Sequence, residues 1–405
     1  MKANIFNVFI VLYIFESILN TNIYGLNTSF GSVFSILINA LIIALGMFAI
    51  FKLKFNFVAK SLLAFILITL LSTIVNKVNF INFLEFFLRY GQIYFLLSIG
   101  LYFNKDIGLK SIFKTLTLVN LLNFVFNLIF FFEIPIITNK YVGTLDFATG
   151  ILGDALYQCL LSSLVLVMSI FMAKNTSFKH KFLVYLNIVT SLVQIYWSYS
   201  YHFYIVIVLA MIIFLFWGNQ LKVFNKILIS TILITITSFL ISNSEFFTNS
   251  FTTLASTSPK IASYRDLFNG EYQNSFQEII GVGPGQGGSY IGIENNSIIA
   301  ENYFSIYSYF TDKLRRGSIT TLPNTGITTL KSELGYLGLF NFLILLILTY
   351  FRLNVNLSKK NYPLIQASKI LIVIFFLENI FADYLQHSLF PLITFLLAGI
   401  SIEKK

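Results

Sequence analysis

Long apolar runs alternate with short polar segments along the 405 residues of the chain. A helix that crosses about 30 Å of hydrocarbon needs about 20 mostly apolar residues, and it satisfies its own backbone hydrogen bonds. About twelve windows meet this requirement. They lie near residues 4–20, 32–51, 57–76, 82–103, 113–133, 153–173, 182–197, 201–217, 225–243, 327–351, 364–383 and 387–402. The pattern predicts an all-α, polytopic integral membrane protein with about 12 transmembrane helices.

The basic residues sort by loop, and this sorting predicts the orientation. Alternate short loops and both ends of the chain are rich in Lys and Arg, whereas the opposite short loops hold only Lys77 and Lys140. Because loops rich in positive charge stay in the cytoplasm, both termini are expected there. Residues 1–243 then carry the first nine helices, residues 244–326 form one large extracytoplasmic loop, and residues 327–405 carry the last three helices.

The composition agrees with a lipid environment and limits the chemistry. Charged residues make up 11% of the chain and hydrophobic residues 57%, whereas a soluble domain has about 25% and about 45–50%. On a soluble protein the net charge of +10 would suggest nucleic acid. Here the excess is mostly a topology signal, so no nucleic-acid partner is expected. With one Cys and three widely spaced His, no metal site and no cofactor are expected.

Ionisable residues inside apolar spans are costly and are therefore candidates for function. Glu85 and Arg89 are four residues apart and share one helical face. They form either a self-neutralised structural pair or a site in which Arg89 binds an anion near the outer surface. Asp383 and His387 have the same spacing near the outer end of their span. These charges all fall on the outer side of the predicted topology.

The outer loop contains a predicted amphipathic helix over about 259–280. Its apolar residues recur at three- and four-residue steps and share one side of the helix. Arg265 projects from the middle of this apolar stripe, where its guanidinium calls for an anionic partner such as phosphate. The alternative is that Arg265 reaches lipid headgroups. The polar residues that are expected to point away are Asp266, Asn269, Gln273 and Gln277.

A glycine-rich turn, Gly281-Val282-Gly283-Pro284-Gly285-Gln286-Gly287-Gly288, follows this helix. Such a turn can aim backbone N–H groups at phosphate, which makes Gly283 and Gly285 candidates for substrate binding. No predicted strand precedes the turn and no GK[ST] motif follows it, so it is not a nucleotide-binding fingerprint. A plain hinge is the alternative.

Further charges follow the glycine-rich turn. Arg315 and Arg316 form a basic cluster that suits either an anionic ligand or lipid headgroups. Glu333 lies about two turns into the tenth predicted span. Its carboxylate could serve as a general base or as an ion-pair partner for Lys331 or Arg265.

The order of these motifs resembles the superfamily of O-antigen polymerases and O-antigen ligases. That family has an Arg followed by an aromatic residue, then a GxG loop, a His-Asn pair and a span that contains Glu-Leu-Gly-x-x-Gly. The corresponding segments here are Arg265 to Phe268, Gly281 to Gly285, Pro323-Asn324 and Glu333 to Phe340. The motif resemblance covers about residues 265–340, and the hydropathy resemblance covers the whole chain.

Two departures from the family pattern bear on the site. The family's Ser-Arg motif in the turn between the paired middle spans is here Ser198-Tyr199-Ser200-Tyr201-His202, with no Arg. Arg89, His202 or the pair Arg315 and Arg316 could replace that second phosphate-binding Arg. The His of the His-Asn pair is also absent, and this favours a polymerase over a ligase.

The resemblance implies a metal-independent glycosyl transfer at the outer face of the bacterial cytoplasmic membrane. The donor would be a glycan on undecaprenyl diphosphate, and the acceptor a hydroxyl of another lipid-linked repeat unit of O-antigen or capsule. Membrane lipids and a chain-length regulator protein would be its partners. Arg265 and Arg89 would hold the diphosphate, and Glu333 or Asp383 would orient or deprotonate the acceptor. The remaining candidates for substrate binding are His202, Gly283, Gly285, Arg315, Arg316, Asn324 and His387.

Two other functions stay open from the sequence. An O-antigen ligase would transfer a finished chain from the same lipid carrier. A flippase for the lipid-linked sugar would favour charged groups at mid-depth and repeated half-structures. The intramembrane charges are one-sided and the two halves show no repeat, which favours the enzyme.

Overall fold

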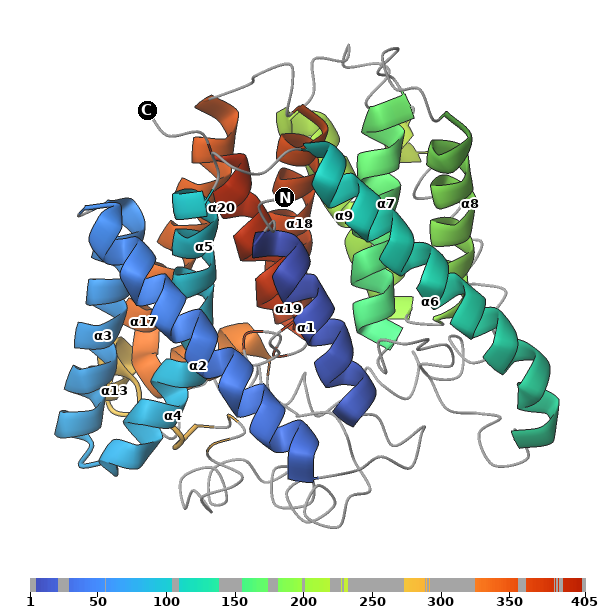
Figure 1. Cartoon of the computed structure of the whole chain (residues 1–405). Helices are drawn as coiled ribbons and strands as arrows, with labels where there is room; N and C mark the ends of the chain where they lie inside the picture. Colours follow the sequence, from blue (N-terminus) through green and yellow to red (C-terminus); the bar gives the residue numbers. More distant parts are fainter. Residues whose placement is uncertain are drawn as a thin grey trace.

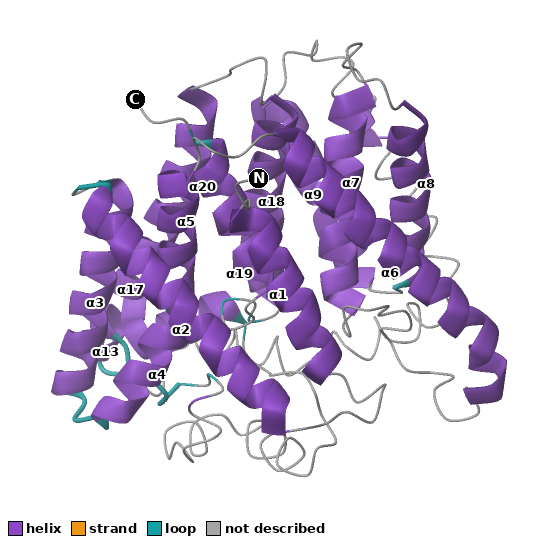
Figure 2. Cartoon of the chain, in the orientation of Figure 1, coloured by secondary structure: helices purple, strands orange, loops and turns teal. Residues whose placement is uncertain are grey.

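The computed structural model describes residues 5–20, 29–54, 56–103, 109–137, 155–173, 181–198, 201–218, 227, 229–231, 273–287, 289, 291, 325–355, 362–381, 383, 385 and 389–402. Within these ranges every regular element is helical and no strand occurs, as Figure 2 shows. The all-α prediction is confirmed for this part of the chain.

The helices follow the predicted apolar windows closely. In chain order they are α1 (Ile5–Asn20), α2 (Ser29–Lys52), α3 (Phe57–Val75), α4 (Phe80–Tyr90), α5 (Gln92–Phe103), α6 (Leu109–Ile137), α7 (Ala155–Ala173), α8 (Lys181–Trp197), α9 (Tyr201–Gly218), α13 (Ser275–Ile280), α17 (Gly326–Val355), α18 (Tyr362–Phe381), α19 (Leu389–Pro391) and α20 (Leu397–Ser401). A π-helical stretch, Leu392–Leu396, joins α19 to α20. The predicted ninth span, 225–243, falls almost wholly outside the described residues.

Several of these helices are long and apolar enough to cross a membrane. Among the described residues five meet both conditions, and α4 with α5 counts as a sixth if the bent pair is one span. The chain is therefore a membrane protein by the length and composition of its helices. The five segments are Phe34–Lys52, Phe57–Val75, Leu109–Ile129, Gly326–Leu353 and Tyr362–Phe381. The twelve predicted spans stay a prediction.

The helices run side by side in two groups, with α18 between them (Figure 1). On one flank α3 packs against α17 and α2 against α5, and on the other α6 and α7 both pack against α8. α18 contacts α17 on one side and α7 and α9 on the other. Protein buries 78% of the α18 span, against 22% of the α2 span. α18 is thus the central helix, whereas α2 has most of its apolar surface left for lipid.

Two predicted spans are broken instead of continuous. The window 82–103 divides at Gly91 into α4 and α5, which are bent by 42°. α17, predicted as one span over 327–351, is interrupted at Gly335, whose φ of 66° and ψ of −166° are not helical. This backbone conformation is essentially restricted to glycine, so a residue without a side chain allows the break. Apolar length predicts a span but says nothing of where its helix is interrupted.

Asparagine side chains begin three of the helices around these breaks. Asn56 accepts a hydrogen bond from the backbone N–H of Ala59 at the start of α3. Asn79 does the same for Ile81 at the start of α4, and Asn274 caps α13. Each cap satisfies an N–H group that the first helical turn leaves without an intrahelical partner.

The amphipathic segment differs from its prediction in the part that is described. Residues 259–272 lie outside the described residues. The helix that follows, α13, begins at Ser275 because Asn274 and Gln277 form a reciprocal capping box there. One helix therefore does not run unbroken into Ile280.

The placement of one polar residue before α13 also differs from its prediction. Gln273, expected to point away, is only 9% exposed, whereas the apolar Phe276 is 53% exposed. The reason lies in α17, whose break leaves backbone groups that only polar neighbours can satisfy. Gln273 therefore turns inward, whereas Phe276 lies on the surface of the protein.

Candidate functional site

The site is built around the break in α17. In an unbroken helix the carbonyls of Ser332 and Glu333 would accept hydrogen bonds from backbone N–H groups one turn later in the chain. Gly335 interrupts the helix and removes these hydrogen bonds. The glycine-rich loop supplies replacements. The N–H of Val282 donates to the Ser332 carbonyl over 2.9 Å, and the N–H of Gly283 donates to the Glu333 carbonyl over 3.1 Å. An unsatisfied carbonyl costs several kcal/mol in lipid, so the loop makes the break tolerable.

The side chain of Glu333 holds the same loop. Its Oε2 accepts from the N–H of Gly285 over 2.7 Å. Its Oε1 accepts from the N–H groups of Ser289 over 2.9 Å and Gly287 over 3.3 Å. Glu333 is fully buried. The loop thus forms a concave array of N–H groups of the kind that binds anions, and a carboxylate of the protein occupies it.

Close approach explains a glycine at position 287. A Cβ added there would overlap the Oγ of Ser332 and the side chain of Glu333. Any larger residue would therefore push the loop away from the carboxylate. The glycine at this position is thus required by the contact between the loop and α17.

The loop is joined to α3 as well. The Nδ2 of Asn76 donates to the Gly281 carbonyl over 3.0 Å, and its Oδ1 accepts from Gln277 over 3.0 Å. The Ser72 hydroxyl donates to the Glu333 carbonyl over 3.0 Å. The glycine-rich loop, the end of α3 and the break in α17 therefore form one hydrogen-bonded unit, which we call the loop unit.

Lys331 lies on the other side of this unit. Its ammonium donates to the Oε1 of Gln273 over 2.8 Å and lies 5.0 Å from the centre of the Tyr336 ring. The Nε2 of Gln273 donates in turn to the Ser332 carbonyl over 3.2 Å. The expected pairing of Lys331 with Glu333 is replaced by this amide, and Glu278 adds an electrostatic interaction.

A second buried polar contact joins the break in the α4–α5 pair to the end of α18. The Tyr90 hydroxyl donates to the Oδ2 of Asp383 over 2.6 Å, and both residues are buried. The Tyr90 ring stacks on Phe86 with centroids 4.1 Å apart. The charges of Asp383, Glu333 and Arg89 all act on this hydroxyl. Of these three charges, Asp383 is the one that contacts Tyr90 directly.

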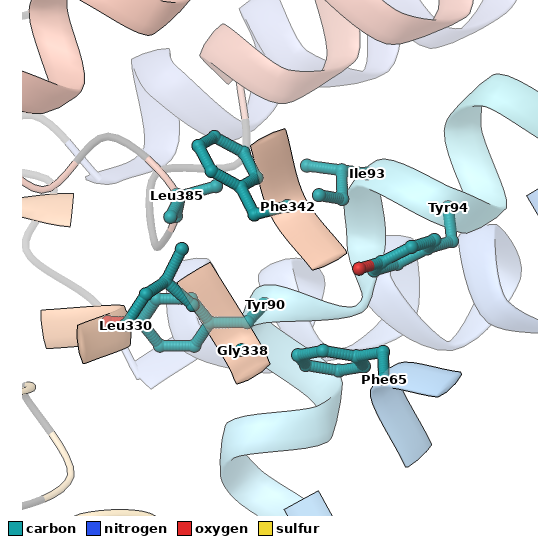
Figure 3. A pocket seen from close by; sticks show the side chains of 8 residues that line it. All are labelled: Phe65, Tyr90, Ile93, Tyr94, Leu330, Gly338, Phe342 and Leu385. Carbon is teal, nitrogen blue, oxygen red and sulfur yellow. The ribbon is translucent and has the colours of Figure 1, made fainter. Parts of the chain in front are cut away.

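Figure 3 shows the small cavity between the two helix breaks. Tyr90 and Ile93 flank Gly91, whereas Leu330 and Gly338 flank Gly335. The Tyr94 hydroxyl at its rim accepts from the Nδ2 of Asn341 over 2.9 Å. The full lining is Phe65, Tyr90, Ile93, Tyr94, Leu330, Gly338, Phe342 and Leu385. This mostly apolar lining suits no sugar, so the cavity marks where the broken helices meet.

The structure brings together some of the residues predicted from sequence. Glu333 contacts Gly283 and Gly285 directly, and Asp383 contacts the neighbour of Arg89 in α4. The Oε2 of Glu85 has no hydrogen-bond partner among the described residues. His202 lies in the first turn of α9, and its side chain is outside the described part. Five further candidates also lie outside it: Arg265, Arg315, Arg316, Asn324 and His387.

Sequence reasoning missed two features. Tyr90 was not a candidate because a Tyr in an apolar span has no distinctive pattern. A seam of buried amides between α6, α7 and α8 was also missed, although the spacing of 120, 123 and 127 places three Asn on one face of α6. The amides of this seam are Asn120, Asn123, Asn127, Gln158, Asn187 and Gln194.

Within the described ranges no three His, Cys, Asp or Glu side chains lie together in a group that could hold a metal ion. The site is instead defined by carboxylates, backbone N–H groups, Tyr90 and Arg89. No protein-family model matches the chain, and no curated protein matches it either.

Proposed function

We propose that the protein is a polysaccharide polymerase. It would transfer a glycan from undecaprenyl diphosphate to a lipid-linked repeat unit at the outer face of the bacterial cytoplasmic membrane. The observation that carries the proposal is the contact between the two motifs of the resemblance. Glu333 opens the Glu-Leu-Gly segment and accepts hydrogen bonds from the glycine-rich loop more than forty residues before it. Two motifs that contact each other support the resemblance more strongly than two motifs that are only present in the same order.

The proposed topology has about 12 spans, with 244–326 as the outer loop and both termini in the cytoplasm. On this topology the loop unit, Arg89 and Asp383 all lie towards the outer face. Both substrates are anchored in the membrane by lipid tails. They would meet at a fixed depth, and this proximity lowers the barrier without any cofactor.

In the proposed reaction, a hydroxyl oxygen of the acceptor sugar attacks the anomeric carbon of the donor. The bond from that carbon to the diphosphate oxygen breaks, and its electron pair leaves with undecaprenyl diphosphate. The acceptor proton passes to Asp383, which Tyr90 holds in place. Arg89 and Arg265 stabilise the charge that grows on the diphosphate. Asp383 takes this role in preference to Glu333, whose carboxylate oxygens are engaged by the loop.

A deletion strain tests the proposal in the cell. Loss of a polymerase leaves single repeat units on the final acceptor, because the other steps continue. Loss of a ligase would leave long chains on the lipid carrier, and loss of a flippase would leave single units facing the cytoplasm. Either of these last two outcomes would contradict the polymerase.

One observation favours the flippase as a second candidate. α17 and the α4–α5 pair are both broken, and residues near each break line one cavity (Figure 3). Broken helices that meet inside a membrane are typical of transporters. Purified protein in vesicles separates the two: a polymerase lengthens lipid-linked units supplied on one side, whereas a flippase only moves them across.

A further inference from the structure

The glycine-rich loop directs five N–H groups at two residues of α17. Val282 and Gly283 donate to backbone carbonyls at the break, and Gly285, Gly287 and Ser289 donate to the carboxylate of Glu333. A general base needs an oxygen that faces its substrate. Both oxygens of this carboxylate face the loop, and the side chain is fully buried.

We infer that Glu333 is a positioning residue whose carboxylate is the resident anion of the loop at 282–289. It closes the loop over the break in α17, in place of a substrate phosphate. The inference goes beyond the proposed function and holds for an enzyme or a transporter. It also changes the sequence-based role of Glu333 from acid–base chemistry to loop closure.

Three features support a resident anion. The donors alternate at 285, 287 and 289, so their N–H groups come from the same side of the loop onto two oxygens 2.7 to 3.3 Å away. The glycine at 287 packs directly on the Glu333 side chain. Hydrogen bonds to an ionised group are also roughly twice as strong as neutral ones, which suits a site that excludes water.

Loop closure reaches the residues of the proposed chemistry. Gly285 packs against the side-chain amide of Asn82, in the first turn of α4. Arg89 and Tyr90 form the last turn of the same helix. An open loop therefore removes a contact that fixes α4, and through α4 it shifts the Tyr90 contact to Asp383.

The inference predicts that removal of the side chain creates an anion site. In Glu333→Ala the three N–H groups would surround a hole the size of a carboxylate. Formate fits this hole and is a weak base. Nitrate has a similar planar shape and no useful basicity, so it tests shape and charge apart from proton transfer.

The experiment is hydrogen exchange, followed by mass spectrometry, on the full chain in lipid nanodiscs. In Glu333→Ala the amides of 282–289 are expected to exchange about tenfold faster or more, since charge-assisted hydrogen bonds are lost. Added nitrate and added formate should both slow this exchange towards the wild-type rate. Glu278→Gln is the matched control, because it removes a nearby carboxylate that makes no hydrogen bond to the loop. Its loop exchange should stay as in the wild type.

Several results overturn the inference. One is an unchanged loop exchange rate in Glu333→Ala, and another is an equal acceleration in Glu278→Gln. A third is rescue of polymer synthesis by formate but not by nitrate, because basicity would then be the missing property. The exchange measurement does not depend on enzymatic activity. It therefore tests the role of Glu333 even when the protein makes no polymer.

Glu333→Gln keeps the test decisive if the alanine variant does not fold. Its amide oxygen still accepts from one side of the loop, while its amide nitrogen faces the remaining N–H donors. Exchange should be intermediate and should not respond to nitrate, because the slot is filled. If the loop amides of Glu333→Gln exchange as slowly as those of the wild type, the negative charge of Glu333 is not needed to hold the loop.

Discussion

Two buried polar regions of this membrane protein are built in opposite ways. The loop unit, together with α4 and Asp383, contains charged groups, broken helices and a glycine in a backbone conformation that other residues rarely adopt. The amide seam between α6, α7 and α8 contains only neutral side chains on helices that stay regular. Both regions contain buried polar side chains, but their chemistry differs.

The seam is satisfied by its own side chains. The Nδ2 of Asn123 donates to the Oε1 of Gln194 over 2.7 Å and to that of Gln158 over 3.0 Å. The Nε2 of Gln194 donates to the Oδ1 of Asn120 over 2.9 Å, and Asn127 also donates to Gln158 over 2.7 Å. Such interhelical hydrogen bonds hold membrane helices together.

The loop unit instead satisfies backbone groups that the breaks expose. Its carboxylates and Arg89 are placed by loops and helix ends, which can move more easily than helix centres. Buried polarity alone therefore does not single out a site in this protein. The proposed function uses the region where charge and an interrupted backbone occur together, whereas the amides lie on intact helices and join them.

The largest expected effect is a loss of activity when Asp383, beside the loop unit, is changed. Asp383→Asn keeps the shape and an oxygen that accepts from Tyr90, but it removes the charge that takes the acceptor proton in the proposed reaction. Polymer synthesis should fall about 10²- to 10⁴-fold, while the free energy of unfolding stays within about 1 kcal/mol. The measurement is chain elongation by purified protein. Glu16→Gln, a buried carboxylate of α1, is the control and should retain activity; full activity in Asp383→Asn would remove Asp383 from the chemistry.

Gly335→Ala tests the break in α17. A Cβ there would overlap the carbonyl of Ile279, and the φ of 66° is unfavourable for alanine. We expect a loss of about 3 kcal/mol in the free energy of unfolding, at the upper end for such backbone strain. Thermal unfolding in nanodiscs measures it. Leu337→Ala changes an exposed residue two positions after Gly335 and should lower the free energy of unfolding much less. Equal losses in the two variants would mean that the backbone conformation at position 335 does not require glycine.

Gln194→Leu tests the seam. The change removes the hydrogen bonds that Gln194 makes with Asn120 and Asn123. Asn123 keeps its bond to Gln158 and Asn120 its bond to Thr190, and each buried hydrogen bond that is lost costs about 0.5–1.5 kcal/mol. We expect about 2 kcal/mol of destabilisation and normal activity per folded molecule. Unfolding and elongation assays on one sample decide between a packing role and a substrate role. A stable but inactive variant would place the seam in the site. Leu192→Ala, on the exposed side of α8, serves as the control.

Tyr90→Phe should have the smallest effect. The ring still stacks on Phe86, and only the hydroxyl that positions Asp383 is lost. A single hydrogen bond to a charged group contributes about 1.5–3 kcal/mol. The phenylalanine itself leaves no unsatisfied donor, but the Oδ2 of the buried Asp383 loses the donor from Tyr90, so we expect about 1.5 kcal/mol in stability and a several-fold loss of activity. A loss as large as that of Asp383→Asn would make Tyr90 a catalytic residue in its own right.

Much of the fold was predictable from the sequence. The apolar windows place the ends of α7, α8, α9 and α18 within a few residues, because a helix in lipid has to be apolar along its whole length. The contact between Glu333 and the loop was not predictable, since nothing in the spacing of two motifs says that one fills the other.

The all-helical class, the apolar helices and the short set of charges within them could be read from the amino-acid order. These follow from composition and periodicity, which act residue by residue. The positions of the helix breaks, the directions in which Gln273 and Phe276 face, and the anion that the glycine-rich loop holds became clear only from the packed helices. Those outcomes depend on hydrogen-bond partners far away in the chain. A backbone group exposed by a break takes whichever donor the packed helices bring within reach.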